Sequence, residues 1–149
     1  MSGKSNYCIQ WATQFYVAAE LCRRKYVVTF TLGNAPRTDL QVSSSLNGEF
    51  TVEVKGQSTH NFWLIKEDHD KSRKYYFLVY IPENHEKLVE FFIMTREEMM
   101  AERTKYQKHI EQSSGRYRDE LGGFNWKTIY EKDKNGRFLY KDRWDKLPS

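Results

Sequence analysis

The sequence predicts an α/β fold in which a central mixed sheet is flanked by helices. A helical segment precedes three strand-like segments, a crossover leads to two more, and a second helical segment follows. Elements in this order pack in layers, because each helix has to bury one face against the sheet. With 149 residues, the chain has the commonest domain size and can bury a core. We therefore expect residues 1–149 to form a single domain.

The first part of the chain predicts one helix and three strands. The helix, residues 8–25, is apolar over much of its surface, so we expect it to be buried against the sheet. The strands are expected at residues 26–32, 39–44 and 50–56. Asn47-Gly48 separates the last two strands, and Asn-Gly between alternating segments is the strongest short-range signal of a β-hairpin.

The later part predicts two further strands and a second helix. Residues 62–65 indicate either a short helix or an irregular crossover, and residues 66–74 indicate a polar loop or mobile flap. The two strands are expected at residues 75–81 and 89–94. Thr95 and Glu98 have the spacing of a capping box, which opens a helix that continues to about residue 112.

Residues 113–149 form a C-terminal extension rich in basic and aromatic residues. The mixture includes Tyr117, Trp126, Lys127, Tyr140 and Arg143. Interleaved cations and rings suit the tracking of a nucleic-acid backbone and stacking on its bases. They equally suit a segment whose aromatic side chains pack inward. We expect the extension to pack on the domain.

The composition argues against a membrane protein. No apolar run approaches the length of a bilayer span, and the N-terminal segment lacks the apolar core of a signal peptide. Cys8 and Cys22 have no paired spacing and indicate buried apolar residues in a reducing cytosol. We therefore expect a cytoplasmic protein without a membrane partner. The net charge of +4 permits DNA as a partner without requiring it.

The predicted hairpin has one apolar and one polar face, because side chains alternate between the two faces of a strand. The apolar face of its second strand carries Phe50, Val52 and Val54. The polar face carries two carboxylates, an amine and an amide, from Asp39, Glu53, Lys55 and Gln57. Such a face is either a site for chemistry or a solvated surface with a cross-strand ion pair.

The residue types on the polar face fit a metal-dependent hydrolase. Mg²⁺ takes oxygen ligands and is usually held by one or two carboxylates together with waters and substrate phosphate. A bound metal lowers the pKa of its water, and a neighbouring ammonium can hold that water or offset charge in the transition state. Asp39 and Glu53 are the candidate ligands and Lys55 is the candidate cation, although an acid-x-Lys triplet alone is a weak motif.

Residues 10–57 resemble the core of the PD-(D/E)xK phosphodiesterase superfamily, whose restriction-endonuclease-like fold is shared by archaeal Holliday-junction resolvases. The resemblance is carried by helical residues 14–21, strand residues 26–28, Gly33-Asn34, Asp39-Leu40 and Glu53-Val54-Lys55. It implies the three-layer arrangement of that fold and an Mg²⁺- or Mn²⁺-dependent nuclease that hydrolyses DNA by metal-activated water. Nucleases of this kind often dimerise, so the resemblance is also compatible with a homodimer.

The resemblance also implies roles for individual residues. Asp39 and Glu53 would bind the metal together with the backbone carbonyl of Val54, and Lys55 would assist catalysis. Many relatives carry a glutamate on the first helix, and its counterpart by spacing is Gln14. An amide can hydrogen-bond a metal-bound water but brings no charge. Gln57 shares the strand face with Glu53 and could position water or phosphate.

Two other interpretations of the chain stay open. Gln14 and the weak net charge favour a catalytically inactive module of the nuclease fold that binds nucleic acid or a protein partner. A plain scaffold without a site would follow if Asp39 and Glu53 lay on opposite faces. The four histidines are His60, His69, His85 and His109. None of them pairs at ligand spacing with another histidine or a cysteine, so we expect no zinc site.

Overall fold

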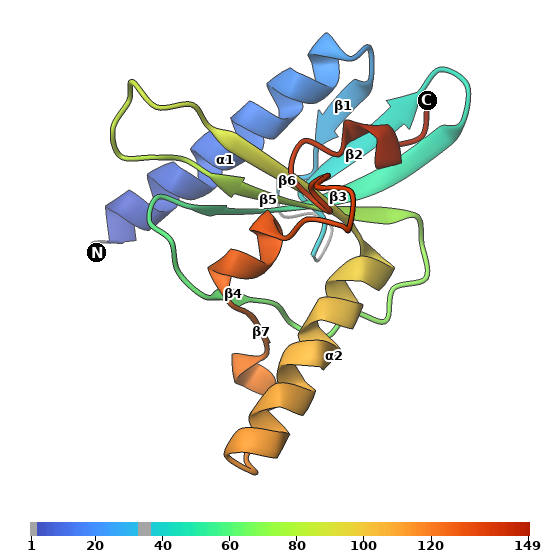
Figure 1. Ribbon diagram of the computed structural model, residues 1–149. Helices are drawn as coiled ribbons and strands as arrows, with labels where there is room; N and C mark the ends of the chain where they lie inside the picture. Colours follow the sequence, from blue (N-terminus) through green and yellow to red (C-terminus); the bar gives the residue numbers. More distant parts are fainter. Residues whose placement is uncertain (1–2, 33–36) are drawn as a thin grey trace.

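The computed structural model describes residues 3–32 and 37–149 of the chain (Figure 1). In chain order its main elements are α1 (Gly3–Arg23), β1 (Val27–Phe30), β2 (Leu40–Ser44), β3 (Gly48–Gln57), β4 (Trp63–Leu64), β5 (Lys74–Tyr80), β6 (Glu90–Thr95), α2 (Arg96–Ser113) and β7 (Gly123–Phe124). Three short 3₁₀ helices complete them, namely η1 (Asp119–Leu121), η2 (Trp126–Tyr130) and η3 (Trp144–Lys146).

Five strands form one mixed sheet in the order β1-β2-β3-β5-β6. The pairs β1–β2, β2–β3 and β5–β6 are antiparallel, whereas β3 and β5 are parallel. A parallel neighbour requires the chain to return to the other end of the sheet. Residues 58–73 make this return, and β4 within them pairs with β7 in a separate two-stranded ribbon. The expected α/β fold with a mixed sheet is confirmed.

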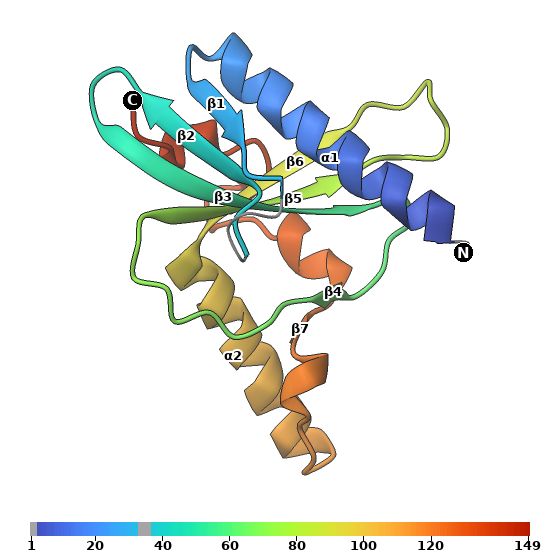
Figure 2. The same ribbon diagram turned by 180° about the vertical axis from the view of Figure 1, so that it is seen from behind.

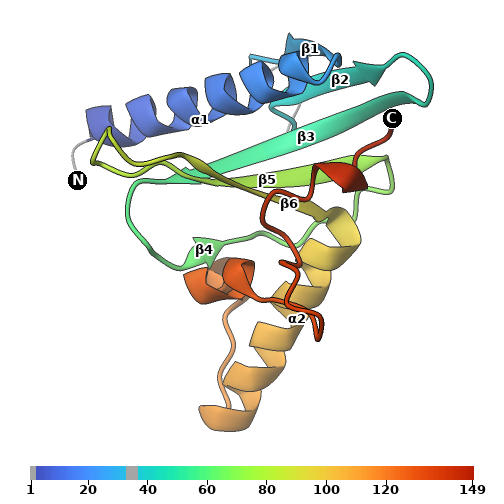
Figure 3. The same ribbon diagram turned by 45° about the horizontal axis from the view of Figure 1, so that its top comes forward.

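The two faces of the sheet bury separate clusters of apolar side chains. Helix α1 runs diagonally across one face (Figure 2). Its Val17 and Leu21 belong to the same buried cluster as Val52 of β3. Helix α2 and the segment from β7 to η2 lie on the opposite face (Figure 3). Strand β5 serves both clusters, since Phe77 points to the α1 side and its neighbour Tyr76 points to the α2 side. The sheet is therefore covered on both faces.

Two local expectations are confirmed by the backbone. Gly48 has a φ of +80° at the turn between β2 and β3, a conformation that glycine adopts at no steric cost. The Thr95 hydroxyl accepts a hydrogen bond from Glu98 N at 3.1 Å, and Glu98 Oε2 accepts one from Thr95 N at 2.9 Å. This reciprocal pair is a capping box, and it begins α2 where the sequence predicts.

The C-terminal extension crosses the β6 edge of the sheet. Lys141 bridges to Phe92 of β6, Tyr140 is buried in the α2-side cluster, and Leu147 is buried in the α1-side cluster. Lys146 Nζ donates to the Ile93 carbonyl at 3.2 Å. The extension thus contributes to both cores, with its aromatic rings directed inward.

Several expectations about single segments are wrong. Helix α1 begins at Gly3 rather than at residue 8. Of the two alternatives for residues 62–65, the crossover is the one found, and residues 63–64 within it form the short strand β4 rather than a helix. Residues 66–73 form the expected loop, but β5 already begins at Lys74, and Asp68 of the loop is only 3% exposed. Cys8 and Cys22 are free and exposed rather than buried, since the sheet-facing stripe of α1 runs through other positions. In the described residues, neither helix is long and apolar enough to span a membrane.

Candidate functional site

The candidate site lies at a fork between β2 and β3. Strand β2 begins at Leu40, opposite Val52, whereas β3 continues to Gln57. Asp39 occupies the point where the two strands separate. Its backbone N–H donates to the Val52 carbonyl at 2.9 Å, and its Oδ2 accepts a hydrogen bond from Val54 N at 2.7 Å. The Asp39 carboxylate therefore closes the fork in place of the next β2 residue.

The backbone carbonyl of Val54 points into the same fork. In an extended strand, the N–H and C=O of one residue point to the same edge. The N–H of Val54 meets Asp39 on the β2 side, whereas the neighbouring residues turn theirs toward β5. A carbonyl oxygen and a carboxylate are consequently directed to one place, which is the arrangement that the resemblance implies for the metal.

Glu53 lies on the strand directly before Val54 and is 9% exposed. One carboxylate oxygen, Oε1, lies 3.4 Å from Lys55 Nζ. The other, Oε2, lies 2.9 Å from Lys74 Nζ, yet the contact lacks hydrogen-bond alignment, so Oε2 is a buried oxygen without a hydrogen bond from any described residue. Each carboxylate oxygen of Glu53 thus has an ammonium group nearby, and Oε2 accepts no hydrogen bond from the described residues.

Lys74 belongs to a buried charged network that the sequence did not indicate. Its side chain is 1% exposed, and Nζ lies 2.7 Å from Asp68 Oδ2. The Tyr76 hydroxyl donates a hydrogen bond to the same oxygen. Burial alone would raise the pKa of Asp68, but the hydrogen bonds from Lys74 and Tyr76 outweigh it and hold that pKa far below its ordinary value. Asp68 is therefore a carboxylate that anchors Lys74 beside Glu53.

The fork and this network act on one another electrostatically. Burial raises the pKa of the Asp39 carboxyl group, the hydrogen bond from Val54 opposes the rise, and the negative charge of Glu53 adds to it. Lys55 and Lys74 lower the same pKa. The charges of Glu53, Lys55 and Lys74 therefore all act on the Asp39 carboxyl group.

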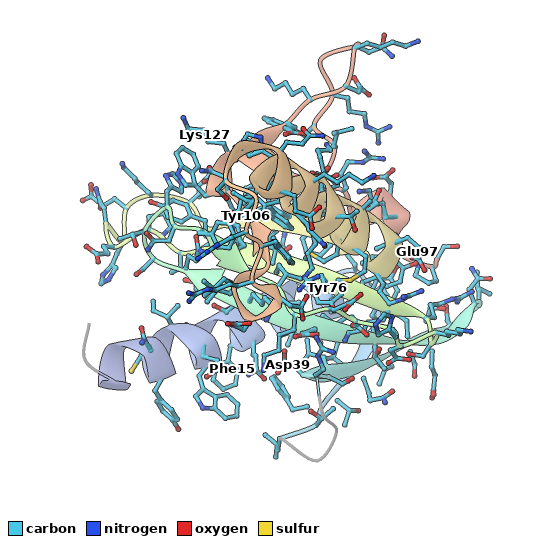
Figure 4. The ribbon with its side chains drawn as sticks, turned by 90° about the horizontal axis from the view of Figure 1, so that it is seen from below. Phe15, Asp39, Tyr76, Glu97, Tyr106 and Lys127 are labelled. Atoms are coloured by element: carbon cyan, nitrogen blue, oxygen red, sulfur yellow. The ribbon has the colours of Figure 1, made fainter. Side chains whose placement is uncertain are left out.

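Helix α1 borders the fork with amide side chains. Gln14 lines a pocket of about 210 Å³ together with Asp39 and Trp11. Figure 4 shows Asp39 between Phe15 of α1 and Tyr76 of β5. Gln14 thus lies on the side of α1 that faces the site, as its spacing predicts, and its amide is within the same pocket as the carboxylate. Gly33-Asn34, which also carried the resemblance, lies outside the described residues.

A second pocket, of about 370 Å³, lies on the other side of the fork. It is lined by Lys55, Gly56 and Asn61, and by Asn6 and Gln10 of α1. Gln10 lines both pockets. Gln10 was missed in the sequence, although its position four residues before Gln14 places both amides on one helix face.

Gln57 is engaged within its own loop. Its Nε2 donates to the Phe62 carbonyl at 3.1 Å, and its Oε1 accepts from Asn61 N at 3.1 Å. Both ends of the amide are used, so Gln57 braces the chain that forms the wall of the second pocket. The direct contact with water or phosphate that the sequence suggested would require these two hydrogen bonds to break.

His60 is part of an aromatic stack and not of a group of ligands. Its ring lies 4.2 Å from the ring of Tyr80 and 4.3 Å from that of Trp126, measured between centroids. Among the described residues, no group of three or more His, Cys, Asp or Glu side chains is placed to hold a metal ion. Any ion at the fork would therefore rely on two carboxylates, a carbonyl and water.

Comparisons with known proteins add no further assignment. No protein-family model matches the sequence, and no curated protein or solved structure shows significant similarity to it.

Proposed function

We propose that the chain is an Mg²⁺- or Mn²⁺-dependent nuclease of the restriction-endonuclease-like fold that hydrolyses DNA phosphodiester bonds with metal-activated water. The observation that carries the proposal is the 2.7 Å hydrogen bond between Asp39 Oδ2 and Val54 N. It holds one carboxylate against the strand segment that bears Glu53 and Lys55. The order of the elements, with a helix, three antiparallel strands, a crossover and a parallel strand, supports the same family.

The donor set suits a hard divalent cation. Asp39, Glu53 and the Val54 carbonyl offer oxygen atoms only, and Mg²⁺ needs no more than one or two carboxylates when water and phosphate complete its shell. The buried Glu53 Oε2, which accepts no hydrogen bond from any described residue, suits a ligand atom. A bound ion would polarise the phosphoryl group and lower the pKa of its water.

Other residues would act without touching the ion. Lys55, with its side chain 29% exposed, can reach a phosphate or the attacking water and offset the charge that develops there. Gln14 can orient a water through its amide. Lys74 would keep Glu53 directed at the fork, since it is held from behind by Asp68. Gln57 would support the loop of the second pocket rather than the reaction.

A second candidate function is an inactive module of the same fold that binds nucleic acid or a protein. The observation in its favour is the pair of ammonium groups on Glu53, at 3.4 Å from Lys55 and 2.9 Å from Lys74. These two ammonium groups supply positive charge where a metal would otherwise be needed. Gln14 adds no negative charge that would attract a metal. Lys74 is the residue that weakens the case for catalysis most.

A cleavage assay tests the proposal. Labelled duplex, single-stranded and four-way-branched DNA are incubated with Mg²⁺, with Mn²⁺ and with EDTA. We expect metal-dependent cutting that falls at least about 100-fold in Asp39→Asn, the scale of losing one electrostatic contact to a transition state. Glu49→Gln, at the exposed start of β3, should cut normally.

The other outcomes are equally informative. Equal cutting by Asp39→Asn would place the activity elsewhere and reject the proposal. DNA binding without any cutting would select the inactive module.

Cys8 and Cys22, both free and exposed, suit a reducing cytoplasm, which is the setting that we propose. Sedimentation of the purified protein would show whether it works as a homodimer.

A further inference from the structure

The sheet-facing stripe of α1 changes character along the helix. In its C-terminal half the stripe is apolar, with Val17 and Leu21 fully buried. In its N-terminal half the stripe carries Asn6 and Gln10, which face the end of β3 across the second pocket. Packing on the sheet explains the apolar half. The amides contribute nothing to an apolar core, so they indicate a surface kept for a polar ligand.

A ladder of aromatic rings runs along the neighbouring side of the same half of the helix. Tyr7, Trp11 and Phe15 follow one another at intervals of four residues, with ring centroids 6.4 Å and 5.8 Å apart. Phe30 of β1 continues the ladder at 5.7 Å from Phe15. The Tyr7 and Phe15 side chains are 63% and 58% exposed. Exposed rings in a continuous row indicate a binding surface.

The ladder leads directly to the fork. Tyr7 and Trp11 line the same pocket as Gln14 and Asp39. Among the described residues that line the two pockets, Asp39 is the only acid and Lys55 the only base. A ligand lying here would meet flat rings, then amides, then the ammonium group of Lys55. Those are the contacts that take a base face, a base edge and a phosphodiester, respectively.

We propose that α1 binds an unpaired single strand of DNA, whose bases stack on the ladder of Tyr7, Trp11, Phe15 and Phe30 while its backbone enters the fork. This inference deepens the proposed function and rests on it for the place of the scissile phosphate. A duplex cannot use the ladder in this way, because its base faces are already stacked on one another. Sequence-tolerant stacking on aromatic side chains is how proteins hold single strands.

The experiment measures DNA binding in EDTA, so that cleavage plays no part. Fluorescence anisotropy of a labelled oligothymidine is compared with that of a duplex of equal length. We expect Phe15→Ala and Tyr7→Ala each to weaken single-strand binding by about 5- to 100-fold, the effect of losing one stacked base. Duplex binding should change by less than about twofold. Tyr16→Ala is the matched control, since Tyr16 is 44% exposed on the same helix but outside the ladder.

Three results would overturn the inference. The first is unchanged single-strand binding in both ladder variants. The second is a loss of single-strand binding in Tyr16→Ala equal to that in the ladder variants. The third is sedimentation showing that the ladder variants convert a dimer into a monomer, since the rings would then contact a second copy of the chain. Failure of the proposed function would look different, because a protein that never cuts DNA can still show ladder-dependent single-strand binding in EDTA.

Discussion

Lys74 Nζ lies 2.7 Å from Asp68 Oδ2 and 2.9 Å from Glu53 Oε2, with the lysine side chain almost entirely inside the protein. A buried ammonium between two carboxylates couples the loop before β5 to the strand that carries the candidate site. Removing one partner of such a group leaves the others charged and without compensation, which costs more than the network contributes when intact.

Lys74→Met should lower the free energy of unfolding by about 3–5 kcal/mol, measured by urea denaturation. Combining it with Asp68→Asn should recover part of this loss, since the double variant no longer buries an unpaired aspartate. Lys71→Met is the control, because Lys71 is exposed in the same loop. Purely additive losses in the double variant would show that Lys74 and Asp68 are not coupled.

Acid should destabilise the protein partly through Asp68. Its pKa is held far below the ordinary value, so its ionised form stabilises the native state at every pH above the unfolded pKa of about 3.9. As the pH falls below that value the unfolded state takes up the proton first, and this stabilisation is lost. In urea denaturation from neutral pH to about pH 2, Asp68→Asn should flatten the acid side of the stability curve. Glu83→Gln, exposed between β5 and β6, should leave its slope unchanged.

Gly56→Ala should separate α1 from β3. A Cβ atom at Gly56 would lie 2.0 Å from the Thr13 hydroxyl oxygen, which is far inside contact distance. We expect a loss of about 1–3 kcal/mol of stability, as for other overpacked positions. Adding Thr13→Ala removes the clashing oxygen and should restore much of the loss. An unaffected Gly56→Ala protein would mean that the helix does not approach the strand this closely.

Asp39→Asn and Lys55→Met should separate metal binding from catalysis. Asp39→Asn removes a proposed ligand, so the affinity for Mn²⁺, measured by calorimetry, should weaken by at least about tenfold. Cleavage should be lost with it. Lys55→Met should keep Mn²⁺ binding but lose cleavage, since the ammonium group is proposed to act on phosphate or water. Loss of metal binding in both variants to the same degree would contradict the separate roles.

The parts of the fold that depend on neighbours in the chain could be predicted. The β2–β3 hairpin follows from Asn47-Gly48 and the alternation around it, and the start of α2 follows from Thr95 and Glu98. The meeting of Asp39 with the strand of Glu53 is a consequence of the hairpin, so both carboxylates could be named from the sequence. Their catalytic roles stay predictions.

The parts that depend on distant pairing could not be predicted. Lys74 reaches Glu53 only because β5 lies parallel to β3, in a register that places Tyr76 beside Glu53. Asp68 lies in a loop without any periodic pattern, so nothing local indicated that it is buried. The cysteines were misplaced for a related reason, since the burial of a helix position depends on which stripe meets the sheet.

The passage of the C-terminal extension over the β6 edge affects how the protein is synthesised. Leu147 belongs to one core and Tyr140 to the other, so both faces of the sheet lack part of their cover until this segment has left the ribosome. Domains usually begin to fold as they emerge, N-terminal part first. Here the nascent chain would present an open strand edge and apolar patches until residues 140–147 have emerged, and chaperones that shield such surfaces should improve the recovery of active protein from expression hosts.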